Sequence, residues 1–357
     1  MKMKKLSRLG SVQAGAVIVA VLFGLSAGLF GCATKVKVNM LQPAKHHRAS
    51  LTKTVAVLPF EGPGGAEFAS EVESVLAGVM VNGKPYFTLV DRMNINRTLS
   101  ELELSQTGLL DEKTASRVGK MLGAEGIYTG RVIYSDVKDS PSVQARQECV
   151  RYQILYDKKG KPFQGPCLQF RQRLIKCTER VASFTVNPKL VSVSTGQILY
   201  AQTLTDMARS YGCEDGRPPE SGAVLLKHVK DNVKNQFRRD IAPFYVTEEI
   251  ALMDLKDMIP TAEAREKLKQ GIEFAGGDRM DRACELWEEA RAEAPDLPAL
   301  LFNLGVCAES RGDFETALAF YRSADRLMMK PDDNITSALK RAEKSIENQK
   351  KLGEEMR

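Results

Sequence analysis

The sequence is poor in the residues and motifs on which most enzymes and metal sites depend. It contains three histidines and one tryptophan. It has no H-E-x-x-H motif, no C-x-x-C pair and no Gly-Lys-Ser/Thr phosphate loop, and acidic Glu67 and Glu71 follow its Gly-rich turn at 62–65. Only one histidine, His228, falls within a predicted folded domain. These absences predict a protein with no catalytic residues, no cofactor and no metal site.

Excess charge and long apolar runs are scarce as well. The formal net charge is +6, but residues 1–31 carry four Lys or Arg and no acidic residue, so the rest of the chain carries +2. This excess is too small to predict nucleic acid as a partner. The one long apolar run, Val17–Phe30, is shorter than the roughly 20 residues of a membrane-spanning helix.

That apolar run has the features of a bacterial export signal. It follows the basic residues Lys2, Lys4, Lys5 and Arg8. It ends in Leu29-Phe30-Gly31-Cys32, which resembles a lipobox apart from the bulky Phe30. The resemblance implies that residues 1–31 are removed and Cys32 is acylated. Because each buried methylene contributes about 0.8 kcal/mol, several acyl chains would form a permanent membrane anchor. An ordinary export signal with an incidental cysteine is the alternative.

The residues after the signal predict a short tether and then a folded domain. Residues 32–52 are polar and basic, and we interpret them as a tether that lifts the fold off the bilayer, with His46 and His47 solvated rather than metal-bound. Residues 53–246 then alternate strand and helix patterns, which is typical of an α/β layer domain. The expected elements are strands at 54–60, 86–91 and 126–134, helices at 66–81, 94–105, 111–122 and 221–237, and a hairpin at 190–204.

Several spaced motifs in this domain resemble one family. They are VAVLPFEG at 55–62, YFTLVDR at 86–92, ELELSQTG at 101–108 and VGKMLGAEGIYTGRV at 118–132. Together they resemble the curli production assembly/transport (CsgG-like) family, which includes penicillin-binding-protein activator lipoproteins and is related to the TolB amino-terminal domain. The resemblance covers roughly residues 50–245. It implies a mixed-sheet α/β fold and a non-catalytic outer-membrane lipoprotein that faces the periplasm; Ala33 after Cys32 favours the same sorting.

Residues 138–190 are predicted as a β extension, and they decide between two functions. The curli channel places two hairpins per protomer in the membrane at about this position, so the resemblance also admits a secretion pore. A membrane strand needs an uninterrupted apolar face. Here Arg171 and Arg173 lie on one face and Gln172 and Lys176 on the other, and a basic side chain on the lipid side costs about 2–4 kcal/mol. A soluble extension is therefore favoured.

Six cysteines remain for the folded parts if Cys32 is acylated. In an oxidising compartment we expect at least one disulfide within the first group, without a predicted pairing. We expect Cys284 and Cys307, in the second domain, to be buried reduced thiols. The candidates for disulfide bonding in the first domain are Cys149, Cys167, Cys177 and Cys213.

A repeat of 34 residues organises residues 264–349, after a predicted linker at 247–263. The spacing of glycine, alanine, an aromatic residue and alanine resembles the tetratricopeptide repeat, in which small residues lie where paired helices touch. Asn334–Gln349 supplies a capping helix. The residues predicted to form the repeat core are Gly271, Phe274, Ala283, Trp287 and Ala290, matched by Gly305, Ala308, Ala317, Tyr321 and Ala324.

These observations predict a two-domain, lipid-anchored protein of the cell envelope that is not an enzyme. The expected function is that of a scaffold or adaptor in envelope assembly, secretion or cell-wall synthesis, with protein partners bound through residues 264–349. An oligomeric outer-membrane secretion pore like the curli channel is the alternative. The sequence does not predict the oligomeric state or the identity of the partner.

Overall fold

The computed structural model describes residues 33–102, 112–254 and 261–357; the predicted signal peptide and Cys32 lie outside these ranges. None of the helices within them is both long and apolar enough to span a membrane. The strands are β1 (Lys35–Gln42), β2 (Thr54–Val57), β3 (Met80–Val81), β4 (Lys84–Pro85), β5 (Thr88–Leu89), β6 (Gly126–Tyr156), β7 (Pro162–Ser192), β8 (Ile198–Ala201), β9 (Leu204–Cys213) and β10 (Phe244–Ala251). The helices are α1 (His47–Ser50), α2 (Gly65–Ala77), α3 (Arg92–Glu101), α4 (Glu112–Leu122), α5 (Gly222–Ile241), α6 (Ala262–Gly276), α7 (Met280–Glu293), α8 (Pro298–Ser310), α9 (Phe314–Leu327) and α10 (Asp333–Glu355).

The predicted α/β domain is confirmed as a six-stranded mixed sheet with helices on both faces. The strand order is β5-β2-β6-β7-β8, and β9 also pairs with β7. β2 is parallel to β5 and β6, whereas β6, β7, β8 and β9 are joined by antiparallel pairs. The apolar run that predicted the first strand is buried on both faces, as the central position of β2 requires.

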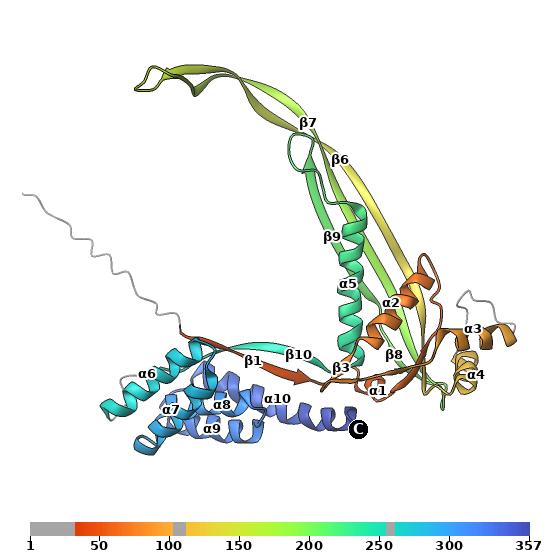
Figure 1. Cartoon of the computed structure of the whole chain (residues 1–357), viewed down its shortest axis with the longest axis vertical. Helices are drawn as coiled ribbons and strands as arrows, with labels where there is room; N and C mark the ends of the chain where they lie inside the picture. Colours follow the sequence, from red (N-terminus) through yellow and green to blue (C-terminus); the bar gives the residue numbers. More distant parts are fainter. Residues whose placement is uncertain (1–32, 103–111, 255–260) are drawn as a thin grey trace, which may run out of the picture.

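Each face of the sheet has its own core. On one face α2 and α5 pack through residues such as Phe68, Val72, Val229 and Phe237. On the other face α3 and α4 cover only the end of the sheet near β2. The rest of that second face therefore has no helix from the described chain packed on it (Figure 1).

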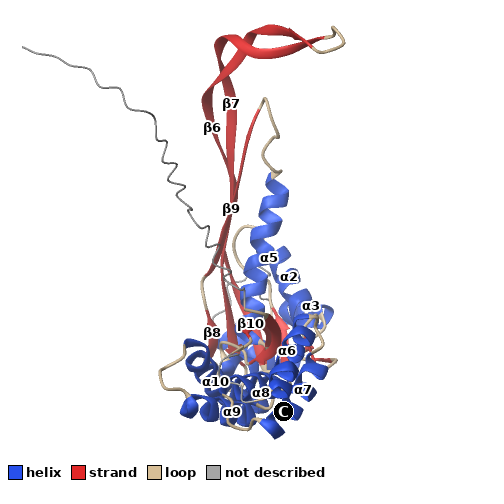
Figure 2. Ribbon diagram, turned by 90° about the vertical axis from the view of Figure 1, so that its left-hand side faces the viewer, coloured by secondary structure: helices blue, strands red, loops and turns tan. Residues whose placement is uncertain are grey.

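The predicted strand at 126–134 and the predicted β extension at 138–190 belong to one continuous hairpin, β6–β7. Each strand has 31 residues, and the ladder runs from Gly126↔Ser192 to Tyr156↔Pro162. β9 supports it only up to Cys177↔Cys213, so residues beyond that pair form a two-stranded ribbon. Figure 2 shows this ribbon projecting past the end of α5.

The helical part contains five helices, which confirms the predicted all-α domain. α6 pairs with α7 and α8 with α9, and α10 packs on α9. α10 continues to Glu355, six residues beyond the predicted capping helix. Its last turn reaches the α/β domain, where the side chain of Glu355 is fully buried.

The predicted tether is wrong, because most of it is folded. Residues 35–42 form β1, which pairs antiparallel with β10 along eight residues. Val36, Val38 and Met40 of β1 are buried in the core of the helical domain together with residues from β10. The predicted boundaries at 52/53 and 246/247 therefore do not separate the domains. β1 precedes the sheet domain in the sequence and β10 follows it, and both strands pack in the helical core.

Candidate functional site

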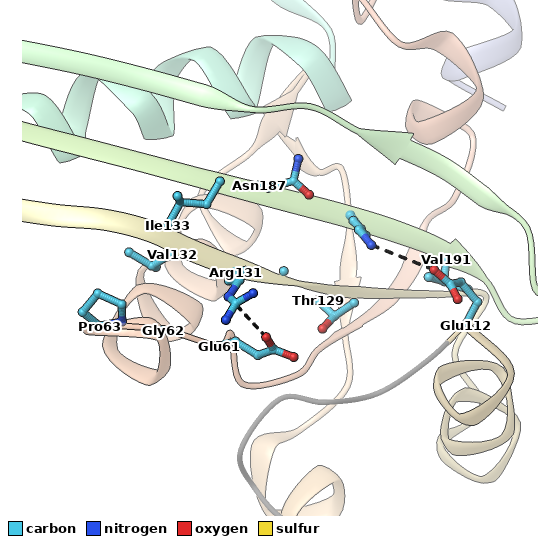
Figure 3. A pocket seen from close by; sticks show the side chains of 12 residues that line it. Glu61, Gly62, Pro63, Glu112, Thr129, Arg131, Val132, Ile133, Asn187 and Val191 are labelled. Atoms are coloured by element: carbon cyan, nitrogen blue, oxygen red, sulfur yellow. Dashed lines mark ion pairs between the residues drawn. The ribbon is translucent and has the colours of Figure 1, made fainter.

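A polar hollow of about 620 Å³ lies on the sheet face beside the Gly-rich turn and the start of α4. Two ion pairs border it: Arg131 Nε lies 3.5 Å from Glu61 Oε2, and Lys189 Nζ lies 3.9 Å from Glu112 Oε1 (Figure 3). Its other lining residues include Thr129, Asn187 and the apolar Val132, Ile133 and Val191.

The lining of this hollow is polar, with paired charges. Its lining contains neither histidine nor cysteine, and each of its carboxylates already faces a basic side chain. Within the described ranges no group of three or more His, Cys, Asp or Glu is placed to hold a metal ion. The residues that line the hollow therefore provide hydrogen bonds and charge, without a nucleophile paired to a base.

The glycines of the turn serve close packing rather than phosphate binding. Gly62 and Gly64 adopt φ values of +84° and +71°, which side-chain-bearing residues rarely adopt. A Cβ atom on Gly62 would lie 2.0 Å from the carbonyl oxygen of Val132, and one on Gly65 would lie 2.1 Å from that of Phe60. Glycine is required at 62 because the turn touches Val132 of β6, and at 65 because the turn touches the backbone of Phe60, which follows β2.

Residues 58–216 match the family Curli production assembly/transport component CsgG. The match covers less than half of the 357 residues and contains the hollow and the whole β6–β7 hairpin. No curated protein matches the chain.

Two solved structures are among those with a low similarity to this chain. The LpoB C-terminal domain from Salmonella enterica is 13% identical, with 46% of this chain and 95% of that chain covered and a TM-score of 0.26. Lipoprotein GNA1162 from Neisseria meningitidis is 12% identical, with 52% of this chain and 97% of that chain covered and a TM-score of 0.26.

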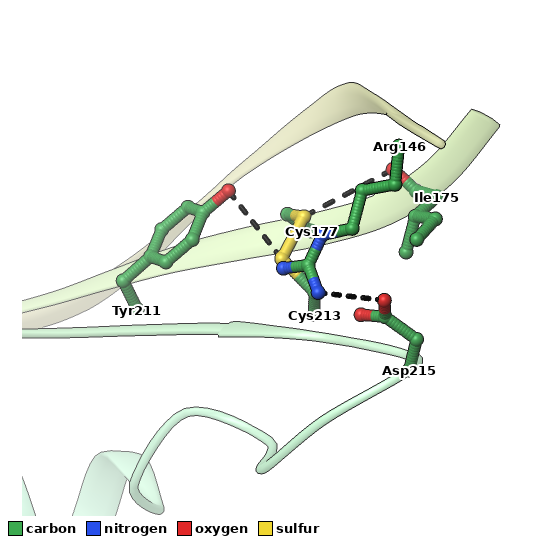
Figure 4. Close-up of a disulfide and its surroundings, with 6 residues drawn as sticks. All are labelled: Arg146, Ile175, Cys177, Tyr211, Cys213 and Asp215. Carbon is green, nitrogen blue, oxygen red and sulfur yellow. Dashed lines mark hydrogen bonds and ion pairs between the residues drawn. A yellow bond between two sulfur atoms is a disulfide. The ribbon is translucent and has the colours of Figure 1, made fainter. Parts of the chain in front are cut away.

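All six cysteines of the described chain form disulfide bonds. Cys149–Cys167 lies near the tip of the hairpin, and Cys177–Cys213 closes the three-stranded part where β9 ends (Figure 4). Beside it, Arg146 pairs with Asp215 at 2.7 Å, and Ile175 is buried against the two sulfurs. Cys284–Cys307 joins α7 to α8, so the prediction of reduced thiols there is wrong; the facing helices bring the two side chains together.

All of the predicted repeat residues except Phe274 are buried. A Cβ atom on Gly271 would lie 2.2 Å from Nε1 of Trp287, and one on Gly305 would lie 2.4 Å from the ring of Tyr321. Trp287 is fully buried, and its indole N–H donates to the carbonyl of Leu268. Phe274 is 39% exposed, whereas its counterpart Ala308 is fully buried. This difference arises because α6 is the first helix of the bundle.

One face of the helices predicted to bind a partner is occupied by the chain itself. β1 contacts α6, α8 and α10, which are the first helix of each pair and the capping helix. Asn303 of α8, which is fully buried, accepts a hydrogen bond from the Met253 N–H at 2.9 Å and donates one to the Met253 carbonyl at 3.0 Å. The β1–β10 ribbon therefore fills the surface that such helix pairs otherwise present to partners.

A buried charge cluster joins three helices of this domain. Arg341 of α10 donates two hydrogen bonds, of 2.6 and 2.9 Å, to the carboxylate of Glu309 on α8. The hydroxyl of Tyr321 on α9 donates to the same carboxylate at 2.6 Å. Burial is the largest cause that raises the pKa of Tyr321 well above its usual value, and the negative charge of Glu309 is the second. No local pattern indicates this cluster, because its members lie on three different helices.

A second cluster attaches the end of α10 to the α/β domain. His47 places Nδ1 2.8 Å from Glu355 Oε1 and Nε2 2.8 Å from Glu354 Oε2. Glu355 also accepts the N–H of Ala44 at 3.1 Å, and its backbone carbonyl accepts a hydrogen bond from Lys53 Nζ at 2.6 Å. His47 is therefore part of a domain contact, in place of the solvated side chain that we predicted.

This contact is expected to weaken as the pH rises from 5.5 to 7.5. The hydrogen bond to Glu355 raises the pKa of His47 above its usual 6.5, against the opposing effect of burial. A raised folded-state pKa stabilises the protein fully below the unfolded-state pKa, and that stabilisation is lost as the pH rises through the folded-state value. Burial lowers the pKa of Lys53 to about 8, so its titration lies mainly above this range.

Urea unfolding at pH 5.5 and 7.5 measures the effect. His47→Asn should remove part of the pH dependence, and its destabilisation relative to the unsubstituted protein should be larger at pH 5.5. His228→Asn is the matched control, because His228 is exposed on α5. Equal destabilisation by His47→Asn at both pH values would contradict the assignment.

Proposed function

We propose that this protein is a lipid-anchored, non-enzymatic scaffold of the cell envelope, attached through acylated Cys32 and carrying a long β hairpin that projects from its α/β domain. The observation that carries the proposal is the β6–β7 hairpin, which lies within the CsgG match and extends beyond the body of the domain. The lipobox-like sequence before Cys32 and the paired charges of the polar hollow support the same assignment.

The position of β1 supports a specific arrangement at the membrane. β1 begins at Lys35, three residues after Cys32. Because an extended residue spans at most about 3.6 Å, an acylated Cys32 would hold the start of β1 within roughly 11 Å of its lipid attachment point. The helical domain, which buries β1, would then lie against the membrane rather than on a long tether. We propose the outer membrane, with the protein facing the periplasm.

A protein partner would bind residues 264–349 on a surface that the β1–β10 ribbon leaves free. Because the ribbon occupies α6, α8 and α10, the surface left to a protein partner is the outer side of α7 and α9. The pore alternative receives less support. In the hairpin register Arg146 faces Arg173 and Glu148 faces Arg171, while Gln147 faces Gln172 on the other side, so neither face is uninterruptedly apolar.

Cys32→Ser tests the anchor. We expect the variant to be exported but released from membranes, with the mass of the acyl chains absent, because no described helix replaces the anchor. Fractionation after washes in high salt and carbonate, together with intact-mass measurement, reads out the result. Ala33→Asp is the control, since it leaves the cysteine in place and should keep the protein membrane-bound. A Ser variant that resists both washes would refute the assignment.

A further inference from the structure

The part of the hairpin beyond β9 exposes an unusual number of large apolar side chains. We call residues 143–174 the distal hairpin. Leu174 is 70% exposed and Tyr156 is 68% exposed. Contiguous exposed apolar surface on a soluble protein marks a site of interaction. The exposed apolar residues of the distal hairpin are Val143, Val150, Tyr152, Ile154, Tyr156, Phe163, Leu168, Phe170 and Leu174.

The same segment is strongly basic. It contains seven Lys or Arg and two Asp or Glu, whereas residues 262–357 contain 16 basic and 20 acidic residues. Lys158, Lys159 and Lys161 lie in or beside the turn that joins β6 to β7. The carboxylate of Asp157 accepts the backbone N–H groups of Lys159 and Lys161, both at 2.8 Å, which fixes the turn and leaves the lysine side chains exposed.

The distal hairpin also points to a particular side of the molecule. Figure 1 shows it bending towards the side on which β1 begins. If Cys32 is acylated, as the proposed function holds, that side is the one nearest the bilayer. Basic side chains, aromatic side chains and the anchor would then face the same surface.

We propose that the distal hairpin binds the surface of a membrane that contains anionic lipids. The lysines of the turn would contact lipid head groups, and the neighbouring aromatic and aliphatic side chains would enter the interfacial layer, where tyrosine is favoured. The contact is restricted to the interface, because polar side chains on both faces of the hairpin would be costly in the hydrocarbon layer; these are Arg146, Arg173, Gln147 and Gln172. The inference rests on the proposed function for its geometry, but its chemistry is independent of the acyl group.

Vesicle co-sedimentation tests the proposal with the chain from Ala33, which contains every residue that the structure describes and lacks Cys32. We expect binding to vesicles of phosphatidylcholine with 30% phosphatidylglycerol, and much weaker binding to phosphatidylcholine alone. High salt should weaken the binding, because it screens exposed charges. Reversing Lys158, Lys159 and Lys161 to Glu should lower partitioning by about 100-fold. The control reverses three exposed basic residues of α4, Lys113, Arg117 and Lys120, which lie far from the start of β1 (Figure 1), and should bind as the parent does.

A second measurement reports the apolar contact directly. Tyr156→Trp introduces an exposed indole, while Trp287, the one native tryptophan, is fully buried. We expect its emission to shift to the blue on anionic vesicles and to be quenched by lipids brominated near the head group. Equal binding to both kinds of vesicle, binding unaffected by the Lys→Glu substitutions, or self-association through the hairpin in place of vesicle binding would overturn the proposal. Because Cys32 is absent, none of these results bears on the anchor, which the Cys32→Ser experiment tests separately.

Discussion

Replacing Arg341 by methionine is expected to lower the free energy of unfolding of the helical domain by about 3–5 kcal/mol. Arg341 makes both of its short hydrogen bonds to the carboxylate of Glu309, whose side chain is fully buried. Methionine fills similar space but leaves that carboxylate with the hydroxyl of Tyr321 as its remaining side-chain partner. The cost arises from a buried charge without a counter-charge.

Two further variants separate this charge effect from a loss of packing. Adding Glu309→Gln to Arg341→Met removes the buried charge and should recover part of the lost stability. Arg322→Met is the matched control: Arg322 of α9 pairs with Glu343 of α10, but both side chains are exposed, so the loss should be at most about 1 kcal/mol. Urea unfolding of all three variants decides the matter. Equal losses for Arg341→Met and Arg322→Met would contradict the role of burial.

The fold class could be predicted because its signals are local. The continuous apolar run of β2 and the 34-residue spacing of glycine and aromatic residues each depend on a short stretch of chain. Gly271 and Gly305 were predicted as contact positions, and each lies against the aromatic residue predicted with it. The helical and α/β parts were recovered for that reason.

The relation between the two parts could not be predicted, because it depends on residues far apart in the sequence. β1 carries an alternation of lysine and valine at 35–38 that is typical of a half-buried strand, so a local signal existed and was interpreted as a tether. Its partner β10 lies about 200 residues later. Likewise, nothing near Glu355 indicates that its carboxylate binds His47 and the backbone of Ala44.

That the strand at 126–134 and the β extension at 138–190 form two continuous strands could not be predicted, for a different reason. Its distal strands expose apolar and charged residues on both faces, so they lack the simple alternation of a strand with one buried side. Backbone pairing continues nevertheless to Tyr156↔Pro162; Cys149–Cys167 connects β6 to β7 near the tip, and Cys177–Cys213 connects β7 to β9 lower down. The polar hollow was missed as a whole, since its lining comes from the Gly-rich turn, β6, β7 and α4.

Replacing Asn303 by alanine is expected to destabilise the attachment of the β1–β10 ribbon by about 2–4 kcal/mol, because its partner Met253 lies two residues after the end of β10, while the five helices remain folded. Asn303 pairs with both the N–H and the carbonyl of Met253, and all three groups are buried. Alanine leaves the two backbone groups without these partners, and an unsatisfied buried polar group costs about 1–3 kcal/mol. Hydrogen exchange of the amides in β1 and β10 measures the effect, and these amides should exchange faster than those of α8 and α9.

A matched substitution on the outer side of the ribbon tests whether burial is the cause. Thr247 donates a hydrogen bond to Asn39 across β1 and β10, and both side chains are exposed. Thr247→Val should therefore change exchange in the ribbon only slightly, since water replaces the lost partner. If Asn303→Ala left the ribbon amides protected as in the parent, the apolar contacts of Val36, Val38 and Met40 would suffice to hold it. If the helices lost protection together with the ribbon, β1 and β10 would be an inseparable part of the helical core, and release of the ribbon could not free the helix face for a partner.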